Sequence, residues 1–135
     1  DLDGEVKFTG QLGRLAVARF YSLHHVGVFP SIHPEDFGIV AAEMMASGLA
    51  VISSGVGGAW ELFEDGRTGL LFKAGDSQHL ASCLMRLTSD AALLEELRHA
   101  GQREARKRFS VMASASALEA GFKMVDATHR EEMVF

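Results

Sequence analysis

Two glutamates on either side of a predicted helix start are the residues of this 135-residue chain best placed to do chemistry. Glu35 lies just before a helix predicted over residues 38–47, and Glu43 lies inside that helix in an otherwise apolar run. A buried carboxylate without a partner costs several kcal/mol, a large part of what stabilises a small domain. We therefore expect Glu43 either to line a polar cleft or to pair with a buried His or Arg.

The helix start between these glutamates is suited to bind an anion. The backbone amides near Gly38, Ile39 and Val40 have no acceptor within the helix, and such amides bind phosphate oxygens. Glu43 lies roughly 7 Å further along the helix axis at a rise of 1.5 Å per residue. We hypothesise that Glu35 accepts hydrogen bonds from sugar hydroxyls, the amides hold phosphates and Glu43 holds a ribose. The alternative is that Gly38 serves only turn geometry.

These residues must be positioned by a regular framework of strands and helices. Short apolar runs predict strands at residues 5–8, 26–29, 50–53 and 69–72, and helical patterns follow at 12–22, 38–47, 58–63, 77–88, 91–108 and 111–125. This alternation is typical of an α/β fold, a Rossmann-like parallel sheet with helices on both faces. Ligands of such sheets bind at the carboxyl ends of the strands.

Length and composition predict one domain over residues 1–126, followed by a tail at 127–135 without clear periodicity. A hydrophobic content of 47% is enough for one core. Four strands are fewer than a doubly wound nucleotide-binding domain contains, so we expect further N-terminal βα units in a longer parent chain.

Charge and cysteine content exclude several classes of function. The net charge of -5 argues against a nucleic-acid partner, which needs clustered cations. A single cysteine, Cys83, excludes an intrachain disulfide framework and a multi-cysteine zinc site, and it fits a reducing compartment such as the cytoplasm. No apolar run approaches the roughly 20 residues that span a bilayer.

Four cations near the end of the helix at 91–108 predict a solvated helix end, with a weak contact to anionic lipids as the alternative: Arg103, Arg106, Lys107 and Arg108.

A glycine-rich turn follows the strand at 50–53. Its spacing places Trp60 where a dinucleotide fingerprint has glycine, so a Rossmann NAD site is not supported. The amides of Gly57 and Gly58 either face the same cleft as Glu35 or form a plain tight turn.

Several other residues have predicted structural roles. Asp76 or Ser77 and Ser110 are expected to cap helices, because a short oxygen side chain satisfies free amides at a helix start. His24 and His25 are expected to meet exposed carbonyls at the end of the helix at 12–22. Cys83 shares a helical stripe with leucines and is expected in the core.

A longer pattern of residues resembles a known family. It comprises Val6-x-Phe8-x-Gly10, Tyr21, Pro30-Ser31, Glu35-x-Phe37-Gly38, Glu43, Ala46, Gly48, Val51-Ile52, Gly57-Gly58, Glu61, Asp65-Gly66-x-Thr68-Gly69 and Arg108-Phe109-Ser110. This pattern resembles the C-terminal donor-binding domain of family-four (group 1) retaining glycosyltransferases of GT-B fold. It covers nearly the whole chain apart from the tail, and Met44 and Ala50 are mild departures from it.

The resemblance implies a site and a reaction. Glu35 and Glu43 occupy the two positions of the Glu-x7-Glu motif, so Glu35 would be catalytic at the transferred sugar and Glu43 would hold the ribose. The backbone of Phe37, Gly38 and Ile39 would meet the phosphates and sugar. The family transfers a sugar from a nucleotide-sugar to a hydroxyl with retention, without metal or cofactor, in polysaccharide or glycolipid biosynthesis. The acceptor glycan or glycolipid would bind an N-terminal domain, and the full-length protein would contact the membrane peripherally.

One absence limits what the chain is expected to do alone. No Lys or Arg occurs between Arg19 and Arg67, and a helix terminus contributes only about 0.3–1 kcal/mol toward an exposed anion. The resemblance implies that an Arg and a Lys upstream of residue 1 hold the diphosphate. We therefore expect weak nucleotide-sugar binding and no transfer. A GT-B nucleotide-sugar epimerase and a non-catalytic binding module remain the alternative interpretations.

Overall fold

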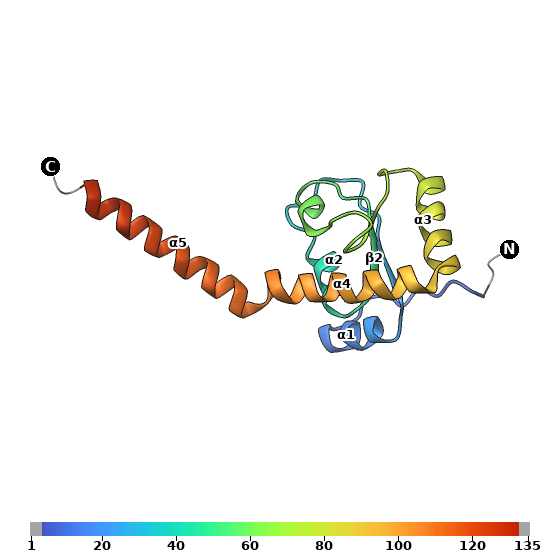
Figure 1. Ribbon diagram of the computed structural model, residues 1–135. Coiled ribbons are helices and arrows are strands. Elements are labelled where there is room, and N and C mark those ends of the chain that lie inside the picture. Colours follow the sequence, from blue (N-terminus) through green and yellow to red (C-terminus); the bar gives the residue numbers. More distant parts are fainter. Residues whose placement is uncertain (1–3, 133–135) are drawn as a thin grey trace.

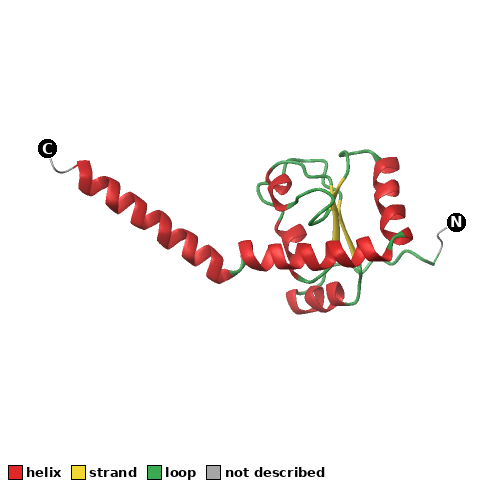
Figure 2. Ribbon diagram, in the orientation of Figure 1, coloured by secondary structure: helices red, strands yellow, loops and turns green. Residues whose placement is uncertain are grey.

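The computed structural model describes the backbone of residues 4–132 and the side chains of residues 4–125. Its elements, in chain order, are α1 (Arg14–Ser22), β1 (Val26–Phe29), α2 (Ile39–Ala46), β2 (Ala50–Ser53), the 3₁₀ helix η1 (Gly58–Leu62), β3 (Leu70–Leu71), α3 (Ser77–Ser89), α4 (Ala91–Phe109) and α5 (Val111–Glu132). Figure 2 shows the strands at the centre of the body, surrounded by helices and loops.

The three strands form one parallel sheet in the order β1-β2-β3. Val26 pairs with Ala50 in β2, and Ile52 of β2 pairs with Leu70 in β3. A parallel pair needs a crossover connection, which α2 supplies between β1 and β2. The predicted parallel α/β class is therefore confirmed.

The predicted strand at residues 5–8 is wrong. This segment forms no strand, and the side chains of Val6 and Phe8 are 59% and 94% exposed. Alternating apolar residues suit a strand, but a strand forms only where a neighbour pairs with its backbone groups. Within residues 4–132, no strand pairs with this segment.

Helices cover both faces of the sheet, as predicted. All four residues of β2 are buried. Val51 packs into a cluster with Met45 of α2, whereas its neighbour Ile52 faces a second cluster with Leu87 of α3. Helix α4 lies across the body in Figure 1 and contributes to both clusters. This packing fixes α2, and with it the predicted site, against the sheet.

The predicted caps and the core position of Cys83 are confirmed. Asp76 Oδ1 accepts a hydrogen bond of 2.9 Å from a first-turn amide of α3, and the Ser110 hydroxyl accepts one of 3.2 Å from Ala113 N–H in α5. His24 Nδ1 lies 2.6 Å from the carbonyl oxygen of Phe20 at the end of α1, whereas among the described residues the His25 ring makes no such contact. Cys83 is buried in the cluster beside α3.

Helix α5 is longer than its sequence pattern predicts. It was expected to end at residue 125 but continues to Glu132, so residues 127–132 of the predicted tail are helical and 133–135 lie outside the described residues. Figure 1 shows α5 leading away from the body. Across the described residues, α5 included, no helix has the length and apolar character needed to cross a membrane.

Candidate functional site

Two loops meet at the carboxyl ends of β1 and β2. The Ser54 hydroxyl donates a hydrogen bond of 2.6 Å to the Ser31 carbonyl. Further along, Glu35 N–H donates to the Val56 carbonyl at 3.3 Å, and Gly58 N–H donates to the Glu35 carbonyl at 2.6 Å. The backbone of Glu35 is thus held on both sides by the loop that follows β2.

This contact dictates glycine at two positions. A Cβ atom on Gly58 would lie 1.9 Å from the Asp36 carbonyl oxygen, and one on Gly57 would lie 2.5 Å from the Glu35 carbonyl oxygen. Gly57 also has a φ of 70°, which side chains rarely tolerate. The tight-turn alternative accounts for both glycines, and the Gly58 amide is occupied by Glu35 rather than open to a cleft.

The Glu35 carboxylate is oriented by a residue of its own loop. The Ser31 hydroxyl donates a hydrogen bond of 2.9 Å to Glu35 Oε1, in a partly buried position. Within the described residues, Oε2 of Glu35 has no hydrogen bond. Sequence reasoning gave Ser31 no role of its own. The available signal was a short hydroxyl residue placed two positions after the end of a strand and four residues before the acid.

The start of α2 leaves its backbone amides unpaired. Gly38 precedes the helix with a φ of 83°, and no side chain in the described part of the chain caps it. The first helical hydrogen bond runs from Ala42 N–H to the Gly38 carbonyl at 3.2 Å. In the described part of the chain, the amides of Ile39, Val40 and Ala41 therefore have no acceptor, the condition that favours an anion at a helix N-terminus.

Glu43 is exposed and lines a cavity between α1 and α2. This cavity measures about 320 Å³, and Arg14, Tyr21 and Ser47 line it as well. Burial, followed by the charge of Glu43, raises the pKa of Tyr21 above its ordinary value. Among the described residues Glu43 makes no ion pair, so the structure favours a cleft position over a buried His or Arg partner.

A second cavity flanks the other side of Glu43. It measures about 280 Å³ and lies between α2 and the end of α4, where Phe37 and Ile39 line it together with Arg106 and Phe109. The ring of Phe37 meets that of Phe109 edge to face at 5.2 Å. Arg106, predicted to be only part of a solvated helix end, therefore shares this cavity with Glu43.

The structure brings the predicted residues together in two groups. Glu35, Gly57 and Gly58 meet through the backbone, whereas Phe37, Ile39 and Glu43 share the second cavity. Glu35 lines neither of the two cavities that Glu43 lines. Gly38 connects the two groups at the start of α2. No group of three or more His, Cys, Asp or Glu side chains that could hold a metal occurs within the described residues.

Comparison with known proteins identifies relatives of this chain. The model of the family "Glycosyl transferases group 1" matches residues 1–108. A phosphatidyl-myo-inositol mannosyltransferase of Mycobacterium leprae is 36% identical over 110 residues, which are 81% of this chain and 29% of that protein. The chain therefore spans less than a third of this relative's length.

Solved structures share the fold. Sucrose-phosphate synthase from Thermosynechococcus elongatus matches 93% of this chain and 31% of its own, with a TM-score of 0.81 and 34% identity. Anabaena HepE in complex with UDP-glucose also has a TM-score of 0.81, at 28% identity over 91% of this chain and 33% of that one.

Proposed function

Because the chain belongs to the group 1 glycosyl transferases and has the fold of their GT-B C-terminal domain, we propose that the protein transfers a sugar from a nucleoside diphosphate to a hydroxyl group. In this proposal the anomeric configuration is retained and no metal takes part. The described residues supply the donor site, and the acceptor is a glycan or glycolipid. The binding of UDP-glucose by the structural neighbour HepE supports a nucleotide-sugar donor.

The observation that carries the proposal is the uncapped start of α2 between Glu35 and Glu43. Its free amides would hold the diphosphate, which is where negative charge develops as the sugar departs. Hydrogen-bond donors oriented toward the departing diphosphate lower the activation barrier of transfer more than contacts that are equally strong in the ground state.

The two glutamates would hold the remainder of the donor. Ser31 occupies one oxygen of Glu35, which leaves Oε2 to accept from a sugar hydroxyl. Glu43 would accept from the ribose hydroxyls, and the cavity of about 320 Å³ beside it has room for a nucleoside.

A donor screen by thermal shift tests the proposal. Wild type and the variants Glu35→Ala, Glu43→Ala and Glu119→Ala would be heated with UDP-glucose, GDP-mannose and ADP-glucose. We expect at least one donor to raise the wild-type midpoint, because a ligand of the folded state stabilises it. Glu119 forms an exposed ion pair with Lys123 on α5, so its variant is the matched control and should respond like wild type. Equal shifts in all four proteins would refute the assigned roles.

Product analysis with the full-length protein separates the reaction classes. Transfer predicts a new glycoside with the donor's anomeric configuration. Epimerised donor without a glycoside would establish the epimerase, and donor binding without turnover would establish a binding module.

A further inference from the structure

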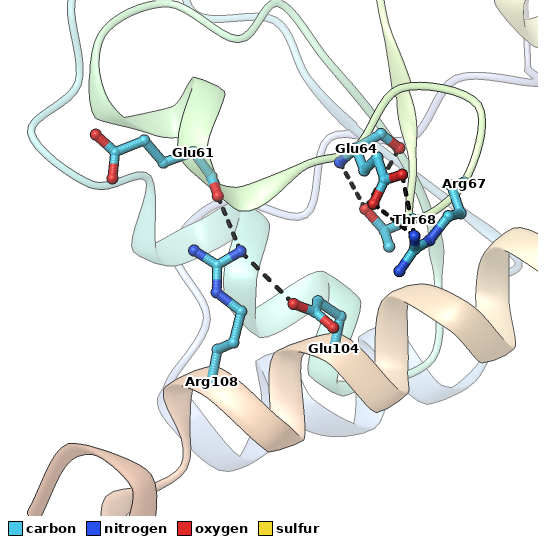
Figure 3. Close-up of polar contacts among 6 residues, drawn as sticks. All are labelled: Glu61, Glu64, Arg67, Thr68, Glu104 and Arg108. Atoms are coloured by element: carbon cyan, nitrogen blue, oxygen red, sulfur yellow. Dashed lines mark hydrogen bonds and ion pairs between the residues drawn. The ribbon is translucent and has the colours of Figure 1, made fainter. Parts of the chain in front are cut away.

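Arg108 leaves the cluster of cations at the end of α4 and reaches η1. Its Nη1 donates a hydrogen bond of 3.0 Å to the Glu61 carbonyl and lies 3.8 Å from Glu104 Oε1. Figure 3 shows the Arg108 guanidinium between these two residues, while the Glu61 carboxylate points away from it. The bond joins positions 47 residues apart in sequence and ties η1 to α4.

Through η1 this contact reaches the loop that carries Glu35. Glu61 lies near the end of η1, and Gly58 at its start donates the 2.6 Å hydrogen bond to the Glu35 carbonyl. A 3₁₀ helix of five residues is short and gains little stability from its own hydrogen bonds. Its position therefore depends on what holds its two ends.

Phe109 holds the other side of the same loop. Its ring packs against the core and meets the Phe37 ring at 5.2 Å with an interplanar angle of 85°. The Arg108 guanidinium also lies 4.8 Å from the centroid of the Phe109 ring, which links the two contacts by a cation–π interaction.

We propose that Arg108 and Phe109 are positioning residues for residues 35–38, here called the donor loop, which they hold between η1 and the end of α4. The effect on the donor rests on the function proposed above, whereas the effect on the loop does not. Neither side chain is assigned a contact with substrate. They fix the backbone of residues 35–38, and this backbone sets the direction of the Glu35 carboxylate and of the first amides of α2.

A general stabilising role would have a different signature. The Arg108 side chain is 40% exposed and its pair with Glu104 is long, and such surface pairs contribute little to global stability. Loss of the Arg108 contact should therefore loosen residues 35–38 and 57–62 more than the rest of the fold. Local opening of this kind is visible in amide exchange.

The test compares Arg108→Gln and Arg108→Lys with Lys107→Gln. Lys107 is the exposed neighbour, and within the described residues its side chain makes no hydrogen bond or ion pair, so its variant makes the same charge change alone. Hydrogen exchange would be followed at the Gly58 amide, which donates the hydrogen bond to the Glu35 carbonyl. We expect Arg108→Gln to speed Gly58 exchange by roughly fivefold, the effect of one lost hydrogen bond. Lysine can donate to the same carbonyl and should restore most of the protection.

A second variant tests the aromatic side of the contact. Phe109→Leu keeps an apolar side chain in the core but removes the ring from Phe37, so exchange should rise at the Ala42 amide, which donates to the Gly38 carbonyl, more than at Gly58. This variant and Arg108→Lys keep the test decisive if Arg108→Gln fails to fold. The proposal would be overturned if the amides of Arg108→Gln exchanged no faster than those of Lys107→Gln. It would also be overturned if exchange became faster in α3 as much as in the loop.

Binding of UDP-glucose is the separate functional readout. We expect Arg108→Gln to weaken it by roughly fivefold relative to Lys107→Gln. Unchanged affinity together with faster loop exchange would overturn the positioning role. Failure of the wild type to bind any donor would instead count against the proposed function, and the exchange data would still decide whether the two residues hold the loop.

Discussion

Replacing Gly58 by alanine tests directly whether the two loops of the site are in contact. Its Cβ would lie 1.9 Å from the Asp36 carbonyl oxygen and 2.8 Å from the Asp36 carbonyl carbon. Both neighbours are backbone atoms, so no side-chain rotation relieves the overlap. To reach even 3.0 Å, the loops must separate by about 1.1 Å.

That separation also removes the hydrogen bond between Gly58 and Glu35. The bond is 2.6 Å long, and the movement takes it beyond the hydrogen-bonding limit of about 3.5 Å. Overpacking and the lost bond together should lower the free energy of unfolding by about 2–4 kcal/mol. For a domain of this size the thermal midpoint should fall by about 10 °C.

Thermal unfolding followed by circular dichroism measures this loss, with Gly121→Ala as the matched control. A Cβ on Gly121 meets nothing within 4 Å, and alanine in the interior of α5 should stabilise that helix slightly. Donor binding should weaken in Gly58→Ala and not in the control. A midpoint for Gly58→Ala within about 2 °C of wild type would refute the loop contact on which the site is built.

Three further predictions concern a cap, a thiol and a glycine. Asp76→Ala should cost about 1 kcal/mol in urea unfolding, because it removes the cap of α3, and no loss would show that the cap contributes nothing. Burial, followed by the charge of Asp65, raises the pKa of the Cys83 thiol above its ordinary value. The unfolded thiol therefore ionises first, and the free energy of unfolding should fall as the pH rises through the ordinary thiol pKa. Cys83→Ala should remove that slope, and a slope unchanged in the variant would contradict the assignment. Gly38→Ala should cost about 1–2 kcal/mol in the same urea assay, because Gly38 has a left-handed φ of 83° and its Cβ would lie 3.0 Å from that of Ala59. Wild-type stability would contradict this conformation.

The elements that the sequence predicted correctly are those whose own residues show how they are buried or capped. Strand β2 is an apolar run buried throughout, so its composition alone identifies it. The caps at Asp76 and Ser110 are equally local, because each side chain reaches an amide of the helix it starts. The segment at residues 5–8 has the same apolar alternation as a strand, yet periodicity does not reveal whether a neighbour exists to pair with it.

The site was predictable in its residue types but not in its contacts. Glu35, Glu43 and the start of α2 follow from spacing along one segment. The contacts of Arg108 with Glu61 and of Phe109 with Phe37 join distant parts of the chain, and only the packing of α4 across the body creates them. The sequence predicted a solvated helix end, and the structure leaves all four cations exposed, but it also ties Arg108 to η1.

The central claim is that a nucleoside diphosphate sugar binds at the start of α2. Titration of the ¹⁵N-labelled chain with UDP-glucose, GDP-mannose and ADP-glucose, followed by amide NMR, tests it most directly. We predict that one of them shifts the amides of Ile39 and Val40 first, together with those of Glu35 and Glu43, and leaves α3 unchanged. Saturable shifts confined to other elements, or no shifts with any donor at millimolar concentration, would contradict the account.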